Sequence, residues 1–244
     1  MRLSRAFVDL PLATGMRLAL PARAAEHLVR VLRLRQGDAC VLFNGDGHDY
    51  GARIAASDRR ETVVVVEDAR RIDNESPLRI TLLQGIARGE RMDLILQKAT
   101  ELGVARILPV FAERTEVRLD GDRLDKRMAH WRSVVASAAE QCGRARLPAL
   151  EAPAPLLPAA AGTEGLRLTL DPGGAADLAT LARPEAMSIT VAIGPEGGWS
   201  PRDRDALAAA GFTGLRLGPR ILRTETAGLA AIAALQALFG DLGG

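Results

Sequence analysis

The sequence has few aromatic residues, few lysines and no long apolar run. Phe, Trp and Tyr make up 3% of the 244 residues, whereas all hydrophobic residues make up 48%, so a core must consist mostly of aliphatic side chains. Lys98 and Lys126 are the only lysines, and the other basic residues are arginines. The longest apolar stretch, residues 227–239, contains Gln236 and is too short to cross a bilayer. Because the first residues also lack a signal-peptide pattern, we expect a cytoplasmic protein with no membrane segment.

Cysteine and histidine are also scarce, which excludes several kinds of site. Cys40 and Cys142 lie far apart, so neither a secreted disulfide framework nor a cysteine-based metal site is expected. His27, His48 and His130 are scattered, so a histidine metal site or a Ser-His-Asp triad is not easily assembled. We therefore expect no metal.

The positive charge is concentrated near the start of the chain. The net charge of +2 is too small to indicate nucleic-acid binding by itself, but residues 1–36 contain seven arginines and two acidic residues. The spacing of apolar residues predicts a helix over residues 23–34, with Ala24, Leu28 and Val31 on one face. The other face is basic and carries Arg23, His27, Arg30 and Arg33. This face is either an ordinary solvated surface or a phosphate-contacting surface, in which case Arg23, Arg30 and Arg33 bind RNA.

The rest of this first part favours strands. The apolar run 39–43 is followed by Asn44-Gly45-Asp46-Gly47, a strong hairpin signal, and residues 48–54 could form the return strand. Residues 62–66 are mostly β-branched, as is typical of strands. Together with the helix, these strands predict a small β-barrel.

A polar segment at residues 72–77, ending in Pro77, predicts a boundary between one domain at 1–72 and another at 73–244. Beyond it, strand patterns alternate with helix patterns, which predicts an α/β domain with a mainly parallel sheet and helices on both faces. The predicted strands cover 78–84, 106–111, 188–193 and 215–217, and the predicted helices cover 90–102, 124–141 and 226–239. Ser200-Pro201-Arg202-Asp203 has the pattern of a further helix start. The Pro- and Ala-rich segment 147–165 is weakly patterned, and we expect it to be a variable surface segment of this domain.

Two glycine-containing segments each follow a predicted strand of this domain. They are Gly194-Pro195-Glu196-Gly197-Gly198 and Leu217-Gly218-Pro219-Arg220. No Gly-x-Gly-x-x-Gly follows a strand and no Lys-Ser/Thr completes a phosphate loop, which argues against dinucleotide and nucleoside-triphosphate sites. Each segment alone could be an ordinary strand-to-helix turn. Two such segments at one edge of the sheet indicate a ligand pocket, because ligands bind at the carboxyl ends of strands in open α/β sheets.

Arg223-Thr224-Glu225-Thr226 begins the last predicted helix and has two possible roles. Thr is a helix-capping residue, and an acidic residue in the first turn suits the helix dipole, so the run can be read as a cap. Alternatively, Arg223 and Glu225 face the occupant of the pocket.

Several motifs in order resemble one known family. They are Glu26-His27-Leu28-Val29-Arg30-Val31-Leu32-Arg33, Gln97-Lys98-Ala99-Thr100-Glu101-Leu102-Gly103, Glu140-Gln141-Cys142-Gly143-Arg144, residues 193–198 and residues 217–226. The chain resembles the ribosomal RNA small subunit methyltransferase E family, the 16S rRNA (uracil-N3)-methyltransferases of the SPOUT superfamily, over essentially its whole length. The resemblance implies an N-terminal barrel similar to PUA domains, a C-terminal α/β domain tied in a trefoil knot, and a homodimer.

The resemblance also implies a cofactor and a substrate. It implies that the chain uses S-adenosylmethionine to methylate N3 of a specific uridine in 16S rRNA of the small ribosomal subunit. The residues that correspond to the family's cofactor site are Leu83, Gly194, Pro195, Glu196, Gly197, Gly198, Leu217, Gly218, Ile221, Leu222, Thr224, Thr226 and Ala227. The alternatives are another SPOUT RNA methyltransferase, acting on tRNA or on ribose 2′-hydroxyls, and a non-catalytic RNA-binding assembly factor.

Chemistry suggests roles for two more side chains. Uracil N3 carries a proton that must be lost before or during methyl transfer, so the site needs a base or a positive group. Glu225 is the candidate base, and Arg223 is the candidate for stabilising negative charge on the uracil carbonyl oxygens. Glu196 could instead be the base or contact the cofactor.

Overall fold

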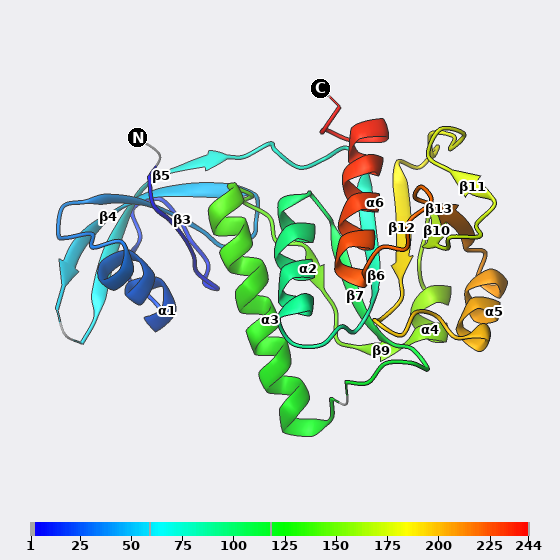
Figure 1. Ribbon diagram of the computed structural model, residues 1–244. Coiled ribbons are helices and arrows are strands. Elements are labelled where there is room, and N and C mark those ends of the chain that lie inside the picture. The colour runs from blue at the N-terminus through cyan, green and yellow to red at the C-terminus, as the bar shows by residue number, and fades with distance from the viewer. Residues whose placement is uncertain (1–2, 59, 118, 244) are drawn as a thin grey trace. The chain divides into compact units, whose positions relative to one another are not determined.

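The computed structural model describes residues 3–58, 60–117 and 119–243. The chain forms two compact units, one of residues 1–75 and 136–147, the other of residues 76–135 and 148–244 (Figure 1). The 22-residue helix α3 (Gly121–Cys142) therefore contributes to both units. Within the described ranges, no helix combines the length and the apolar character needed to cross a membrane.

The first unit is built on a five-stranded sheet in the order β1-β3-β4-β5-β2. Its strands are β1 (Arg5–Phe7), β2 (Arg17–Ala19), β3 (Ala39–Phe43), β4 (His48–Ser57) and β5 (Thr62–Arg71). The predicted hairpin is confirmed, because β3 and β4 pair antiparallel with Leu42 opposite Tyr50, and the turn contains Gly45 and Gly47 at positive φ. The three-residue strands β1 and β2 were not predicted.

The predicted helix of this unit is confirmed but is shorter and differently wound. It consists of α1 (Ala22–Ala25) and a π-helical stretch, η1 (Glu26–Val31). Ala24 and Leu28 are buried as expected, but Val31 is 64% exposed, so its place on the apolar face was wrong. The reason is the wider π turn, in which the amide of Leu32 donates to the carbonyl of His27 and later residues rotate off the α-helical face. Arg33 lies beyond the helix at a φ of 60°.

The second unit is built on an eight-stranded sheet in which every pairing is parallel. The strand order is β11-β13-β10-β12-β6-β7-β8, and β9 also pairs with β7. The strands are β6 (Arg79–Gly85), β7 (Arg106–Phe111), β8 (Ala149–Leu150), β9 (Ala154–Pro155), β10 (Leu166–Leu170), β11 (Ala176–Asp177), β12 (Ser188–Ile193) and β13 (Thr213–Arg216). The prediction of an α/β unit with a mainly parallel sheet is confirmed, although β10, in the middle of the sheet, was not foreseen.

Helices cover both faces of this sheet. Besides α3, they are α2 (Glu90–Glu101), α4 (Leu156–Ala161), α5 (Pro201–Ala209) and α6 (Thr224–Phe239). Leu83 of β6 packs in an apolar cluster with Leu156 of α4 and Leu207 of α5, whereas its neighbour Gln84 bonds to Thr224 of α6 on the other face. Ser200 and Asp203 form the predicted capping box at the start of α5.

The segment 147–165 is more ordered than expected. It contains β8, β9 and α4, and Leu156 and Ala160 are only 4% and 1% exposed. The prediction of a surface segment was therefore wrong for α4, whose small apolar residues pack into the core although their spacing shows little periodicity.

Candidate functional site

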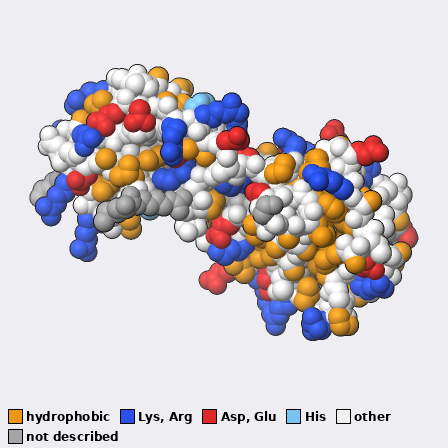
Figure 2. Space-filling view, turned by 90° about the horizontal axis from the view of Figure 1, so that it is seen from above, with side chains coloured by type: hydrophobic (Ala, Val, Ile, Leu, Met, Phe, Trp, Pro, Cys, Tyr) orange, Lys and Arg blue, Asp and Glu red, His pale blue; other side chains and the backbone are white. Residues whose placement is uncertain are grey.

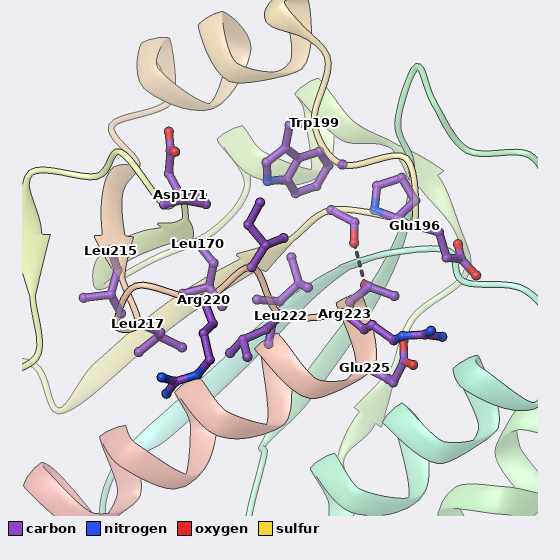
Figure 3. Close-up of a pocket in the computed structure, with 18 of the residues that line it drawn as sticks. Leu170, Asp171, Glu196, Trp199, Leu215, Leu217, Arg220, Leu222, Arg223 and Glu225 are labelled. Carbon is purple, nitrogen blue, oxygen red and sulfur yellow. Dashed lines mark hydrogen bonds between the residues drawn. The ribbon is translucent and has the colours of Figure 1, made fainter.

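The two glycine-containing segments lie together at the carboxyl ends of β12 and β13 and enclose a cavity of about 540 Å³ (Figure 3). Small-molecule sites typically measure roughly 300–1,000 Å³. The predicted site residues on its wall are Gly194, Pro195, Glu196, Gly198, Leu217, Gly218, Ile221, Leu222, Arg223, Thr224, Glu225 and Ala227. Residues far apart in the sequence thus form one pocket, entirely within the second unit.

Three predicted cofactor residues are not on this wall. Leu83 is fully buried in the core on the α4 and α5 side of the sheet. Gly197 faces Arg114, whose Nη1 donates to the Gly197 carbonyl at 3.0 Å. Thr226 is exposed in the first turn of α6.

Close backbone packing fixes the first loop. A Cβ atom on Gly85, at the end of β6, would lie 2.5 Å from the backbone nitrogen of Pro195 and 2.9 Å from the carbonyl carbon of Gly194. Only glycine permits this approach of β6 to the loop that follows β12.

Thr224 joins the first loop to the start of α6. Its hydroxyl donates to the carbonyl oxygen of Gly194 at 2.6 Å, the dashed line in Figure 3. The same hydroxyl accepts a hydrogen bond from Nε2 of Gln84 at 3.1 Å. The interpretation of residues 223–226 as a helix cap is therefore wrong for Thr224. The N-cap residue is Arg223, and its side chain makes no capping hydrogen bond. Thr224 instead holds the two sides of the pocket in register.

Glu196 is held as an anion at the pocket wall. Burial alone would raise the pKa of this carboxyl group, but hydrogen bonds from the backbone amides of Arg88 and Glu196 itself, together with Arg91, lower it below the usual value. The Arg88 amide and Nη1 of Arg91 each lie 2.9 Å from Oε1 of Glu196. A carboxylate stabilised in this way is a weak base, so Glu196 suits a binding role better than proton abstraction.

Glu225 has a different environment. Its side chain is 14% exposed, and Oε1 lies 4.0 Å from Nε of Arg91. Its Oε2 is buried and has no hydrogen-bond partner among the described residues. Because a buried carboxylate oxygen without a partner is costly, this atom is available to accept a hydrogen bond or a proton from a ligand.

Arg223 is exposed and carries no ion pair to any residue within the described ranges. In Figure 3, Arg223 and Glu225 lie toward one end of the pocket, whereas Arg220 lies toward the other. The site therefore presents a carboxylate and a guanidinium at the same end.

Much of the rest of the wall is apolar. Aliphatic side chains come from β10, β12, β13 and the residues that follow β13: Leu170, Ile193, Leu215, Leu217, Ile221 and Leu222. Ile221 is 88% exposed at the rim, which is unusual for its side chain. Gly218, Ile221 and Leu222 form no backbone hydrogen bond with another described residue, so their N–H and C=O groups can bond the edge of a heterocycle.

Several wall residues were not predicted from the sequence. They are Arg91, Leu170, Asp171, Pro172, Ile193, Trp199, Arg204 and Leu215. Leu170 and Asp171 were missed because β10 was missed. Arg91 could have been found, since it lies in the first turn of α2, the helix that follows β6. Because β6 is parallel to β12, the two strands end at the same edge of the sheet. No group of three or more potential metal ligands occurs in the parts of the chain that the structure describes.

The predicted RNA-contacting residues lie in the first unit. Nη2 of Arg23 lies 3.7 Å from Oε2 of Glu140, and the Arg23 side chain is 47% exposed. Nη1 of Arg30 lies 3.9 Å from Oε1 of Glu26, with the Arg30 side chain 77% exposed. Arg33 is exposed past the helix end, so the three cations do not share one helical face.

A Gly85→Ala substitution is expected to displace the 194–198 loop and to weaken binding of any occupant at least tenfold. The added methyl group would meet backbone atoms of Gly194 and Pro195 that cannot move independently. Isothermal titration with S-adenosylmethionine, the cofactor that the family resemblance implies, measures the effect. The control is Gly162→Ala, because that Cβ would meet only the Pro158 and Ala159 carbonyl oxygens, at 3.5 and 3.8 Å. Equal affinity in the two variants would contradict the proposed role of this close approach.

Comparison with known proteins gives two family matches. Residues 74–236 match the RNA methyltransferase domain family, and residues 20–67 match the RNA methyltransferase PUA domain family. Ribosomal RNA small subunit methyltransferase E of Buchnera aphidicola subsp. Schizaphis graminum is 32% identical, covering 99% of this chain and 98% of its own. The protein of that name from Mycobacterium bovis is 34% identical, covering 95% and 90%.

Two solved structures are also similar along the whole chain. A putative methyltransferase from Legionella pneumophila, in complex with bound S-adenosylmethionine, has a TM-score of 0.95 and 37% identity, covering 99% of this chain and 100% of that one. Ribosomal RNA small subunit methyltransferase E from Neisseria gonorrhoeae, bound to S-adenosylmethionine, has a TM-score of 0.90 and 38% identity, covering 98% and 99%.

Proposed function

Because the chain belongs to the ribosomal RNA small subunit methyltransferase E family, we propose that it methylates N3 of a specific uridine in 16S rRNA, using S-adenosylmethionine. The observation that carries this proposal is the pocket formed by the 194–198 and 217–226 segments, in a chain whose similar structures contain that cofactor. The substrate is the small ribosomal subunit, and the site of action is the cytoplasm.

The cofactor would occupy the apolar wall between the two segments. When bound, S-adenosylmethionine supplies an electrophilic methyl group on a sulfonium centre. Leu217, Ile221 and Leu222 would pack against its adenosyl group, while backbone groups of Gly218, Ile221 and Leu222 would bond the polar edge. Thr224 keeps Gly194 in place, and Glu196, ionised and bound by Arg91, fixes the opposite side.

Glu225 and Arg223 would manage the proton and the charge of the uracil. The unpartnered Oε2 of Glu225 takes the N3 proton. The guanidinium of Arg223 then stabilises the negative charge that spreads onto the uracil carbonyl oxygens. Neither role requires a metal.

We also propose a domain type for each unit and a homodimer. The first unit would be a PUA-like barrel and the second a trefoil-knotted SPOUT domain, with the domain boundary between residues 72 and 73. The course of the chain after β13 supports the knot proposal. In the sheet, β10 separates β13 from β12. Nevertheless α6, which follows β13, returns to the ends of β12 and β6, where Thr224 bonds to Gly194 and Gln84. A homodimer is supported by exposed Leu238 and Leu242, 49% and 54% accessible, and by apolar side chains gathered on the visible face of this unit in Figure 2.

The proposal is tested by identifying the modified nucleoside. Small subunits from a deletion strain are incubated with the protein and tritiated cofactor, and digested rRNA is analysed by mass spectrometry. We expect 3-methyluridine. A 2′-O-methylated nucleoside, or label that enters tRNA in a parallel reaction but not the rRNA of small subunits, would favour another SPOUT methyltransferase. Failure to bind S-adenosylmethionine in a titration would favour a non-catalytic assembly factor.

The basic residues of the first unit give a second measurable expectation. Replacing Arg23, Arg30 and Arg33 with Gln should weaken RNA binding and reduce the salt dependence of the affinity. Each phosphate contact releases counterions from the RNA, so binding with fewer contacts releases fewer of them. Fluorescence titrations at several salt concentrations measure both. Because Arg53 is engaged by Glu67 at 2.7 Å, Arg53→Gln serves as the control. A triple variant with the wild-type salt slope would mean that this face is only solvated.

A further inference from the structure

Two arginines that line the pocket have no side-chain partner among the described residues. Arg204 on α5 and Arg220 after β13 both line the cavity and are both exposed. Neither guanidinium forms an ion pair or a hydrogen bond with any residue that the structure describes. Other arginines with partly exposed side chains are engaged, for example Arg106 with Glu151 at 2.9 Å and Arg91 with Glu196 at 2.9 Å. The two unpaired side chains are therefore free to bind an anion.

The balance of charge around the pocket points the same way. The wall carries four arginines and three acidic residues: Arg91, Arg204, Arg220, Arg223, Asp171, Glu196 and Glu225. Arg91 and Glu196 neutralise each other, and Oδ1 of Asp171 accepts from the Gly173 amide at 2.9 Å. Arg223 and Glu225 lie together at one end, away from Arg220 (Figure 3). Arg204 and Arg220, set against Asp171, leave the remaining wall with a net positive charge. A positive rim attracts a polyanion toward the opening.

An RNA strand would bring phosphates to this rim. A base that reacts inside a pocket must leave its stack, so the backbone on both sides of the target nucleotide passes close to the opening. A guanidinium binds a phosphate through two parallel hydrogen bonds, which fixes position as well as adding affinity. The two arginines come from different elements, so together they can define a path for the strand.

We propose that Arg204 and Arg220 form a phosphate-binding rim that holds the substrate RNA backbone beside the cofactor pocket. The proposal rests on the function proposed above and adds a substrate-positioning surface to it. A carboxylate of the cofactor has the same anionic chemistry as a phosphate, so the experiment must separate the two sources.

The test compares Arg204→Gln, Arg220→Gln and the double variant with Arg202→Gln. Arg202 is also exposed on α5, two residues from Arg204, but it does not line the cavity, which makes it a matched control. Binding of a fluorescent oligouridine is measured over a range of salt concentrations. Each lost phosphate contact should reduce the slope of log affinity against log salt by about 0.7. Methylation of small subunits from a deletion strain should show a raised KM for RNA with kcat nearly unchanged.

The outcomes separate the possibilities. Reduced slopes in the two rim variants, a wild-type slope in the Arg202 variant and unchanged affinity for S-adenosylmethionine would support the rim. Weakened cofactor binding with unchanged RNA slopes would overturn it, because the anion would be the cofactor carboxylate. If the rim variants have the same salt slope as the Arg202 variant, the rim is overturned. The proposed function still stands in that case, provided that the wild-type protein methylates small subunits. A wild-type protein without methylation would instead reject the proposed function.

Discussion

Replacing Glu225 with Gln is expected to slow methyl transfer by about two to four orders of magnitude, the usual contribution of a positioned general base. Gln keeps the size and shape of the side chain but cannot accept the N3 proton as a carboxylate does. The partly buried position of Glu225 and its unpartnered Oε2 carry this expectation. Single-turnover rates with saturating cofactor and small subunits measure the chemical step directly.

The control must separate lost chemistry from a weakened helix. An acidic residue in the first turn also stabilises α6 through the helix dipole, by roughly 0.3–1 kcal/mol. Glu90 occupies the first turn of α2, is exposed and does not line the pocket, so Glu90→Gln removes a comparable dipole interaction without touching the site. A Glu225→Gln rate equal to that of the Glu90 variant would reject the base assignment.

Replacing Arg223 with Ala is expected to reduce kcat by at least about a hundredfold while leaving the fold intact. Loss of one group that stabilises a developing negative charge typically costs 10²–10³ in kcat, roughly 2.7–4 kcal/mol. The fold should survive because Arg223 is exposed and makes no capping bond. Methylation of small subunits with tritiated cofactor measures turnover, and thermal unfolding reports the fold.

A lysine at the same position distinguishes charge from shape. Arg223→Lys keeps the charge but loses the planar pair of donors that can reach a carbonyl oxygen, so we expect a rate between those of the wild type and the Ala variant. Titration with S-adenosylmethionine should give wild-type affinity for both variants. Near-normal turnover of Arg223→Ala would contradict the role assigned to the guanidinium.

Much of the second unit could be predicted because its local signals agree with its tertiary environment. Strands β7 and β12 are mostly apolar and are buried along most of their length, and both have the predicted limits. At the start of α5, the order Ser200, Pro201, Asp203 gives three consistent signals for a helix start. β10 was missed because Arg167 and Thr169 interrupt its apolar residues, and nothing local shows that a central strand contains them. Thr169 is satisfied there by long-range bonds to the Ala192 carbonyl and to Nε1 of Trp199.

The candidate site was predictable where the backbone itself makes the pocket. Glycines at strand ends identify the two loops, but they do not indicate which distant side chains reach them. Arg91 contacts Glu196 across 105 residues of sequence, and Gln84 contacts Thr224 across 140. In the first unit, the exposure of Val31 could not be foreseen, because the π turn changes the spacing on which the helical face was predicted.

The contact between Gln84 and Thr224 has a consequence for folding kinetics. Closing so long a loop costs chain entropy before its contacts repay it, so we expect this side of the pocket to assemble late on the folding pathway. A small molecule that binds only the finished pocket stabilises the native state by mass action. Contacts that form late are absent from the folding transition state, so we expect the bound molecule to slow unfolding while leaving the rate of folding almost unchanged.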